Sequence, residues 1–219
     1  MPRRKDQESK VVDPIALTAS LEELKNSGPL PSVFVFDLDY TLWPLWVDTH
    51  VDPPLKRRGQ DLNCVYDRSG TSLSFFPHVS TILFFLKRNK IPIGIASRTS
   101  APDAARQALR GLHIVDTAGP EEEQTPVPAI SLCDHMEIYP GSKIRHFKSI
   151  QKALGHEFED MIFFDDEYRN AEVGRELGVH FVEVSHAGTD VATVVRGVRE
   201  WQAKQKARGG DSTAGSSVL

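Results

Sequence analysis

The stretch VFVFDLDYT, residues 33–41, decides the fold of this chain of 219 residues. Its first four residues are β-branched or aromatic and form an unbroken apolar run, which is typical of a strand buried on both faces. Parallel strands covered by helices have that environment, so the run predicts a central strand of a parallel sheet. Two acidic residues, Asp37 and Asp39, follow at the point where this strand ends.

Three further apolar runs repeat this pattern, and each leads into a polar residue: 91–96 before Ser97, 161–164 before Asp165, and 179–184 before Ser185. Helical periodicity predicts helices between and after them, over 78–89, 101–111, 142–154, 168–177 and 190–204. A weaker apolar stretch at 135–139 predicts an edge or neighbouring strand. Alternating strands and helices favour right-handed βαβ units. We therefore predict an α/β fold with a doubly wound, mostly parallel, Rossmann-like sheet.

The domain organisation follows from where this alternation begins and stops. Residues 1–30 are predicted to be an N-terminal extension with a helix over 15–26, because Pro14 suits the first helical position. The domain itself is placed at 31–204. Residues 205–219 are rich in Gly and Ser without apolar periodicity and are predicted to be disordered.

Two insertions lie within the domain. Residues 43–76 contain two β-like runs around a turn at 67–70, which predicts a small hairpin flap. The helix and strand expected over 77–96 take up the rest of the chain before Ser97, so a large cap domain does not fit. Residues 116–129, which are acidic and rich in proline, are predicted to form a surface loop.

Composition excludes several classes of function. Lys and Arg total 26 against 30 Asp and Glu, and a net charge of −4 argues against a nucleic acid or an anionic membrane as the main partner. Two cysteines are too few for a disulfide scaffold, and no secretory signal or membrane span is apparent. We expect a monomer in a reducing compartment, the cytoplasm, with the nucleus left open.

Polar residues stand at three predicted strand ends: Asp37 with Asp39, Ser97 with Arg98, and Asp165 with Asp166. Ligands of open α/β sheets bind beyond the carboxyl ends of the strands. A single Asp in that position is usually a helix cap or a turn residue, but three such ends together exceed that explanation. Four acids at one edge repel one another unless a cation lies among them, and ligands that offer only oxygen indicate Mg²⁺.

The motif DLDYT at residues 37–41 resembles the signature of the haloacid-dehalogenase-like phosphohydrolases. Ser97, Lys143 and the Asp165–Asp166 pair match the second, third and fourth motifs of that superfamily in order. The flanking stretches FDLDYTLWP, IASRTS, YPGSK and FFDDEYRN narrow the resemblance to its small magnesium-dependent phosphatases. The likeness covers residues 33–184.

The resemblance implies a role for each matching residue. Asp37 is expected to be the nucleophile and a metal ligand. Asp39 is expected to be the general acid and base and to offer its backbone carbonyl to the metal, with Thr41 orienting it. Ser97 and Arg98 would bind the phosphoryl group.

Lys143 would offset the charge on the phosphoryl group and on Asp37. Asp165 is expected to bind the metal directly, whereas Asp166 would act through water or hold Lys143; the sequence does not rank those two options for Asp166. The basic run 56–58 in the flap is a candidate for attracting anionic substrates, although a solvated charge run is commoner. Trp43 and Trp46 are expected to pack rather than to line the site.

The expected function is a magnesium-dependent phosphatase that hydrolyses phosphomonoesters through an aspartyl-phosphate intermediate. Its substrate would be a phosphorylated small molecule or a phosphoprotein, and the open site suits phosphotyrosine or sugar phosphates. Two alternatives stay open. The chain could be a phosphoryl transferase or mutase, or a phosphate-binding module without activity.

Overall fold

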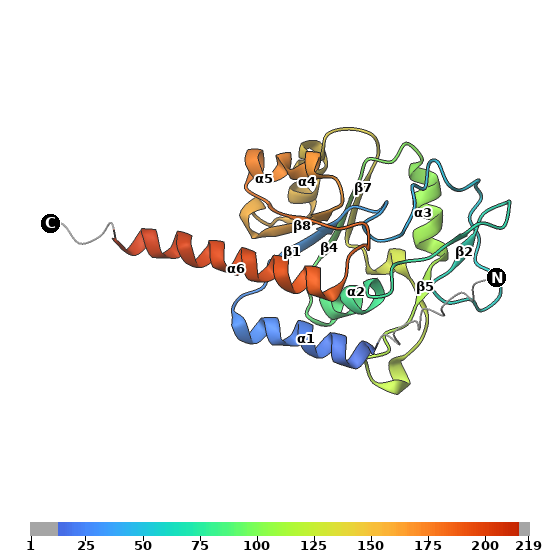
Figure 1. Ribbon diagram of the computed structural model, residues 1–219, viewed down its shortest axis with the longest axis horizontal. Coiled ribbons are helices and arrows are strands. Elements are labelled where there is room, and N and C mark those ends of the chain that lie inside the picture. Colours follow the sequence, from blue (N-terminus) through green and yellow to red (C-terminus); the bar gives the residue numbers. More distant parts are fainter. Residues whose placement is uncertain (1–12, 215–219) are drawn as a thin grey trace, which may run out of the picture.

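Five parallel strands form the central sheet of the computed structural model, which describes residues 13–214 (Figure 1). In spatial order they are β7 (His135–Ile138), β4 (Ile93–Ser97), β1 (Val33–Phe36), β8 (Met161–Asp165) and β9 (His180–Glu183). Strand β1 lies in the middle, paired with β4 and β8, and all four of its residues are buried. The prediction of a doubly wound parallel sheet is confirmed, and the weak stretch at 135–139 is its edge strand β7.

Helices cover both faces of this sheet (Figure 1). Their bounds are α1 Pro14–Ser27, α2 Val79–Arg88, α3 Pro102–Gly111, α4 Lys143–Leu154, α5 Glu172–Leu177 and α6 Val191–Ala214. Alternate residues of β1 face opposite layers, as strand geometry requires. Phe34 and Phe36 pack in the core with α1, α2, α3 and α6, whereas Val33 and Val35 pack with α4 and α5.

Short elements complete the fold. Strands β2 (Val65–Tyr66) and β3 (Ser72–Leu73) pair antiparallel around the turn at 67–70, as the predicted hairpin requires. The expected surface loop at 116–129 carries the 3₁₀ turn η1 (Glu121–Glu123) and ends in β6 (Val127–Pro128), which pairs with β5 (His113–Ile114). Further 3₁₀ turns are η2 (Ala129–Leu132), η3 (Phe158–Asp160) and η4 (Tyr168–Ala171).

Local sequence sets the ends of the helices that matter for the site. Helix α4 begins after Ser142, whose hydroxyl accepts the backbone N–H of Ile144, and it ends at Gly155 in the left-handed conformation with φ of 75°. The cap fixes where Lys143, the first residue of α4, enters the domain. Helix α1 begins at Pro14 with Asp13 as its cap, as predicted from the proline. Its Leu21 and Leu24 are buried in the main core, so this helix is packed into the domain.

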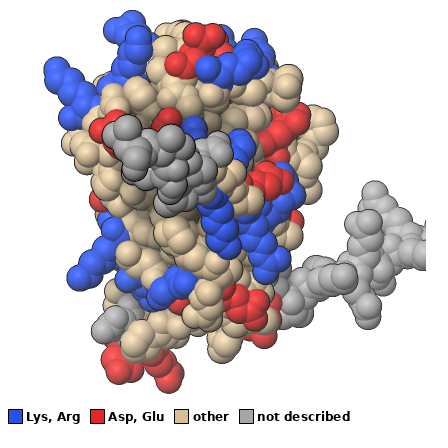
Figure 2. Space-filling view, turned by 90° about the vertical axis from the view of Figure 1, so that its left-hand side faces the viewer, with Lys and Arg blue, Asp and Glu red and all other residues tan. Residues whose placement is uncertain are grey.

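The C-terminal helix is longer than the sequence predicts. Residues 205–214 continue α6, although a disordered tail was expected from residue 205. Two contacts support the added turns: Gln205 donates to the backbone oxygen of Glu159 at 2.9 Å, and Arg208 pairs with the Glu159 carboxylate at 3.1 Å. Figure 2 views the molecule from this side and shows Lys and Arg side chains around the end of α6. Residues 1–12 and 215–219, the outer parts of the two predicted tails, lie outside the described residues.

No helix among residues 13–214 combines the length and the apolar character that crossing a membrane requires.

Candidate active site

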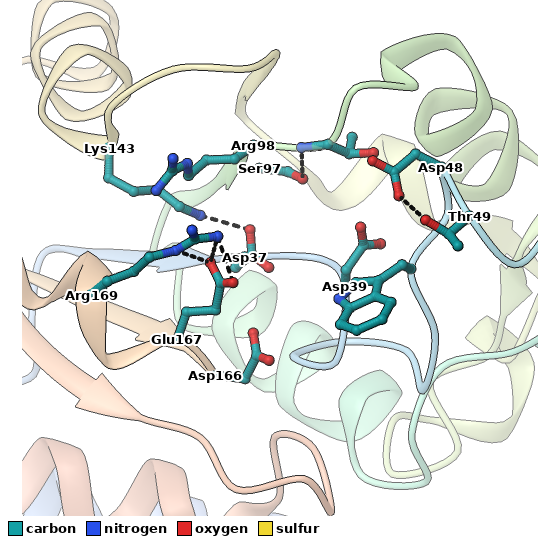
Figure 3. A pocket seen from close by; sticks show the side chains of 12 residues that line it. Asp37, Asp39, Asp48, Thr49, Ser97, Arg98, Lys143, Asp166, Glu167 and Arg169 are labelled. Atoms are coloured by element: carbon teal, nitrogen blue, oxygen red, sulfur yellow. Dashed lines mark hydrogen bonds and ion pairs between the residues drawn. The ribbon is translucent and has the colours of Figure 1, made fainter.

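A cleft of about 350 Å³ opens at the carboxyl edge of the sheet, where β1, β4 and β8 end (Figure 3). The structure brings six of the predicted site residues to it: Asp37, Asp39, Ser97, Arg98, Lys143 and Asp166. Six residues that were not assigned to the site complete the lining: Trp46, Asp48, Thr49, Thr99, Glu167 and Arg169. Two predicted residues, Thr41 and Asp165, lie behind the cleft wall in buried positions.

Lys143 joins two of the acidic residues at the floor of the cleft. Its Nζ lies 2.7 Å from Oδ1 of Asp37 and 2.9 Å from Oδ2 of Asp165, and it also donates to the backbone oxygen of Ala96. The side chains of Lys143 and Asp165 are wholly buried, and that of Asp37 is 11% exposed. Burial alone would favour the neutral amine, but the two carboxylates outweigh it and raise the pKa of Lys143 above its ordinary value. The lysine is therefore a fixed cation beside Asp37.

Three carboxylates along the cleft ionise with difficulty. Burial raises the pKa of Asp37 well above its usual value, although the Lys143 ammonium opposes that change. Burial raises the pKa of Asp39 to about 6. Burial, reinforced by the neighbouring Asp165 carboxylate, raises the pKa of Asp166 to about 6. A group of oxygen ligands whose negative charge is destabilised in this way suits a divalent cation, which favours the ionised forms.

Asp39 is held by a residue that the sequence assigned only to packing. The indole nitrogen of Trp43 donates to Oδ1 of Asp39 at 2.7 Å, and the backbone N–H of Val47 donates to the same oxygen at 3.2 Å. Trp43 is itself fixed because it is buried and stacked on Phe75, with ring centroids 6.0 Å apart. The Thr41 hydroxyl has no hydrogen-bond partner among the described residues, and its backbone N–H closes the turn onto Leu38 at 3.2 Å. Trp43 therefore makes the contact to Asp39 that was expected of Thr41, and an orienting role for Thr41 stays a prediction.

Asp165, the last residue of β8, and Asp166, which follows it, face different ways. Both carboxylate oxygens of Asp165 accept from the amide of Asn170 at 2.9 Å, and Oδ1 also accepts the backbone N–H of Glu167 at 2.8 Å. With Lys143 added, the oxygens of Asp165 are fully engaged within the protein. Asp166 instead lines the cleft (Figure 3). In this structure it is therefore Asp165 that pairs with Lys143, and Asp166 that lines the cleft.

The opposite wall offers donors for an anion. Ser97 ends β4, and its Oγ accepts the backbone N–H of Thr99 at 3.3 Å, which leaves the hydroxyl proton free to donate into the cleft. Arg98 also lines the cleft and is anchored by a 3.1 Å bond to Oδ1 of Asn170. Arg169 reaches the rim while paired with Glu167 at 2.6 Å. These positions suit a phosphoryl group held between hydroxyl and guanidinium donors.

The flap meets the cleft through its first residues and not through its basic run. Trp46 lines the cleft and is 49% exposed. Asp48 accepts the backbone N–H and the hydroxyl of Ser100 at 3.2 and 2.8 Å, which ties the loop after β1 to the loop after β4. The run at 56–58 lies elsewhere: Arg57 donates to the backbone oxygen of Asp61, and Arg58 stacks over Tyr66. The only sequence signal for Trp46 and Asp48 was their place shortly after DLDYT.

The donor chemistry fits Mg²⁺ without a closed cage. Among residues 13–214 no three His, Cys, Asp or Glu side chains converge into a ready-made metal site. Mg²⁺ keeps several waters and is commonly held by only one or two carboxylates together with phosphate oxygens. The carboxylates at the cleft, Asp37, Asp39 and Asp166, provide such ligands.

Comparison with known proteins gives three findings. The family model described as Acid Phosphatase matches residues 29–204. The chain is 43% identical over 153 residues to a HAD-like hydrolase superfamily protein of Schizosaccharomyces pombe, covering 70% of this chain and 85% of that one. It is 39% identical over 176 residues to the human protein named magnesium-dependent phosphatase 1, covering 80% of this chain and 90% of that one.

A solved structure agrees on the fold. It is a HAD-superfamily hydrolase from Ehrlichia chaffeensis, which matches with a TM-score of 0.50 at 11% identity and covers 80% of this chain and 98% of that one. At that level of identity the likeness concerns the fold alone. The resemblance first noted on the motifs is confirmed by the two relatives and by the family model.

Proposed function

Because this chain belongs to the Acid Phosphatase family, we propose that it is a magnesium-dependent phosphomonoester hydrolase with Asp37 as its nucleophile. The coarse activity, hydrolysis of a phosphoester with Mg²⁺ as cofactor, follows from the family and from the relative named magnesium-dependent phosphatase 1. The assignment of residues to steps is our proposal. The observation that supports it most is the buried Lys143, whose ammonium lies 2.7 Å from Asp37 at the floor of the cleft.

In the first step a carboxylate oxygen of Asp37 attacks phosphorus and the bond from phosphorus to the ester oxygen breaks. An aspartyl phosphate forms on Asp37, and the alcohol leaves with a proton from Asp39. In the second step Asp39 takes a proton from water, whose oxygen attacks phosphorus. Inorganic phosphate is released, and Asp37 regains its carboxylate.

Asp39 suits the acid and base role for two reasons. Burial brings its pKa to about 6, so the group can hold and release a proton near neutral pH. The 2.7 Å bond from Trp43 occupies one carboxylate oxygen, which leaves the other oxygen to exchange the proton. Lys143, Ser97 and Arg98 are proposed to bind the phosphoryl oxygens, and Lys143 also offsets the charge that builds up there.

The metal ligands are proposed to be the carboxylate of Asp37, the backbone carbonyl of Asp39 and the carboxylate of Asp166. When bound, Mg²⁺ supplies positive charge that neutralises the phosphoryl group and the carboxylates around it. The direct ligand role expected of Asp165 stays a prediction, and it would require Asp165 to give up bonds to Asn170 or Lys143.

The substrate is a phosphorylated molecule, and we propose that it is bulky. The flap contributes a rim and no cover over the cleft, so phosphotyrosine in a protein or a sugar phosphate can reach Asp37. We further propose a monomer located in the cytoplasm, with no nucleic-acid partner. The unpaired cysteines, Cys64 and Cys133, support a reducing compartment, and the net charge of −4 disfavours nucleic acid.

Hydrolysis of p-nitrophenyl phosphate tests the proposal. Turnover should require Mg²⁺, cease with EDTA and return when excess Mg²⁺ is added. Acid quenching during turnover should trap a phosphorylated protein from which hydroxylamine removes the phosphoryl group. This phosphoryl group serves as the label and should lie on the peptide that contains Asp37. Asp37→Asn should abolish both turnover and labelling, while the exposed control Asp103→Asn on α3 leaves them unchanged. Label on any other residue, or turnover by pure Asp37→Asn, would contradict the assignment.

A further inference from the structure

A second cavity, of about 360 Å³, lies between α5, β9 and the C-terminal half of α6. It shares no lining residue with the catalytic cleft. Its walls combine aromatic rings with cations, and the side chains that matter are Tyr168, Arg175, His180, Phe181, Trp201 and Lys204. None of these residues has a role in the proposed hydrolysis.

The cavity has an excess of positive charge. Arg175, Lys204 and Arg208 line it against a single carboxylate, that of Glu159. Glu159 is paired with Arg208 at 3.1 Å, and among the described side chains, which end at residue 208, neither Arg175 nor Lys204 has an ion-pair partner. Figure 2 shows Lys and Arg side chains on this side of the molecule, with Asp and Glu side chains among them.

Lys204 is held in place by a partner that does not neutralise it. Its Nζ lies 2.9 Å from Nδ1 of His180, which is 4% exposed. Burial lowers the pKa of His180 to about 4, so the ring is neutral at physiological pH and its Nδ1 accepts from the ammonium. The lysine is thereby oriented by an uncharged partner. Because its side chain is already held in place, Lys204 loses less conformational freedom when it binds an anion than a mobile surface lysine would.

The rings form the apolar part of the cavity. Tyr168 is 66% exposed, and its ring meets that of Phe181 edge to face, with ring centroids 6.4 Å apart. Trp201 is buried at the base and fixed by its indole bond to the backbone oxygen of Glu159 at 2.8 Å. Tyr168 and Phe181 therefore offer ring surface next to the cations. The volume lies within the usual range for small-molecule pockets.

We propose that this cavity binds a small aromatic anion, with its ring against Tyr168 and Phe181 and its acidic group between Arg175 and Lys204. Both features are needed to explain the cavity. A simple anion would leave the exposed ring of Tyr168 without a partner, and a neutral ring would leave the two cations without one. The ligand class is an aromatic ring that carries a phosphate, sulfonate or carboxylate.

Naphthalene-1-sulfonate is a suitable probe because a sulfonic acid cannot be hydrolysed by a phosphomonoesterase. Titration calorimetry on the full chain should show one binding site. In NMR spectra the backbone amide resonances of Phe181 and Lys204 should shift when the probe is added. Neutral naphthalene and inorganic sulfate, each tested alone, should bind at least about tenfold more weakly.

Two separate substitutions test the cations. Lys204→Gln and Arg175→Gln should each weaken binding of the sulfonate about tenfold, the change expected from losing one charge-assisted contact. Arg199→Gln is the matched control, because Arg199 is exposed on the same helix and does not line the cavity. The three substituted residues all lie outside the catalytic cleft, so hydrolysis of p-nitrophenyl phosphate should be unchanged in each variant.

Three results would overturn the proposal. The first is an absence of binding by the natural chain at millimolar probe. The second is binding that survives both cation substitutions. The third is a pattern of amide shifts confined to the catalytic cleft, which would mean that the probe sits on Ser97 and Arg98 and that the second cavity is empty.

Discussion

Replacing Lys143 by methionine separates the stabilising role of this residue from its catalytic role. The ammonium lies 2.7 Å from Asp37 and 2.9 Å from Asp165, in a position with no exposure to solvent. Methionine has a similar length but no charge, so two carboxylates would be left without their cation. Breaking a buried ion pair by removing one partner costs about 3–5 kcal/mol. We expect the free energy of unfolding, measured by urea denaturation in EDTA, to fall by that amount.

A second substitution checks the cause. In Lys143→Met combined with Asp165→Asn, the wholly buried carboxylate is gone, and the amide can still bond to neighbouring groups. The double variant should regain about 1–3 kcal/mol relative to Lys143→Met, the size of coupling seen between groups in direct contact. Catalysis should not recover, because the charge near Asp37 is still missing. We expect the rate at saturating Mg²⁺ to stay about 10²–10³ below that of the natural chain in both variants.

The control for this experiment is Lys152→Met, which removes an exposed lysine from the same helix. Its stability and activity should match those of the natural chain. The reasoning is refuted if Lys143→Met loses less than about 1 kcal/mol, since a buried cation between two acids cannot be removed at so small a cost. It is also refuted if the double variant is no more stable than the single one.

Three further predictions follow from particular contacts. Trp43→Phe keeps an aromatic ring but removes the 2.7 Å hydrogen bond from the indole to Asp39. The fall in kcat should be about tenfold larger for alkyl than for aryl phosphates, because an aryl leaving group needs less help from a general acid. Replacing residues 56–58 by Ser should leave KM within about twofold, whereas Arg98→Gln should raise it about tenfold, because Arg98 lines the cleft and residues 56–58 do not. Burial lowers the pKa of His146 from 6.5 to about 4, so the folded state excludes a proton that the unfolded chain binds. Stability should therefore fall as the pH drops from 6.5 towards 4, and the slope in urea denaturation should be shallower in His146→Phe.

The sheet could be predicted because its inner strands are buried on both faces. Such strands leave continuous apolar runs, as in residues 33–36 and 161–164, and polar residues appear where the runs stop. Strand β7 gave a weaker signal because three of its four residues are only half-buried at the edge of the sheet. The extension of α6 to Ala214 gave no apolar signal at all, since contacts to Glu159 support it from a distant part of the chain.

Six of the twelve residues that line the cleft were predicted from the sequence, but the contacts that position them were not. Asp165 and Asp166 are adjacent, and the sequence cannot say which of them turns inward. That choice is made by Asn170 and Lys143, which reach Asp165 from a following turn and from another helix. The indole bond that orients Asp39 depends likewise on how the chain folds back after the strand, which placed Trp43 under the site. The basic run 56–58 was a candidate for attracting anionic substrates, but it does not line the cleft. The charges of these residues do not indicate which side of the hairpin faces the cleft.

The rim of the cleft bears on the choice between hydrolysis and transfer of the phosphoryl group. A transferase or mutase has to keep water from the aspartyl phosphate until its acceptor arrives, and closure over the site is the usual means. Here the loop after β1 is tied back to the loop after β4, because Asp48 accepts two hydrogen bonds from Ser100. Bringing Trp46 over Asp37 would break that tie, and within residues 43–76 the only paired strands are two-residue segments that cannot form a cover. The cleft that Asp37 lines is open in this structure, and that arrangement favours hydrolysis of an aspartyl phosphate over its transfer to another acceptor.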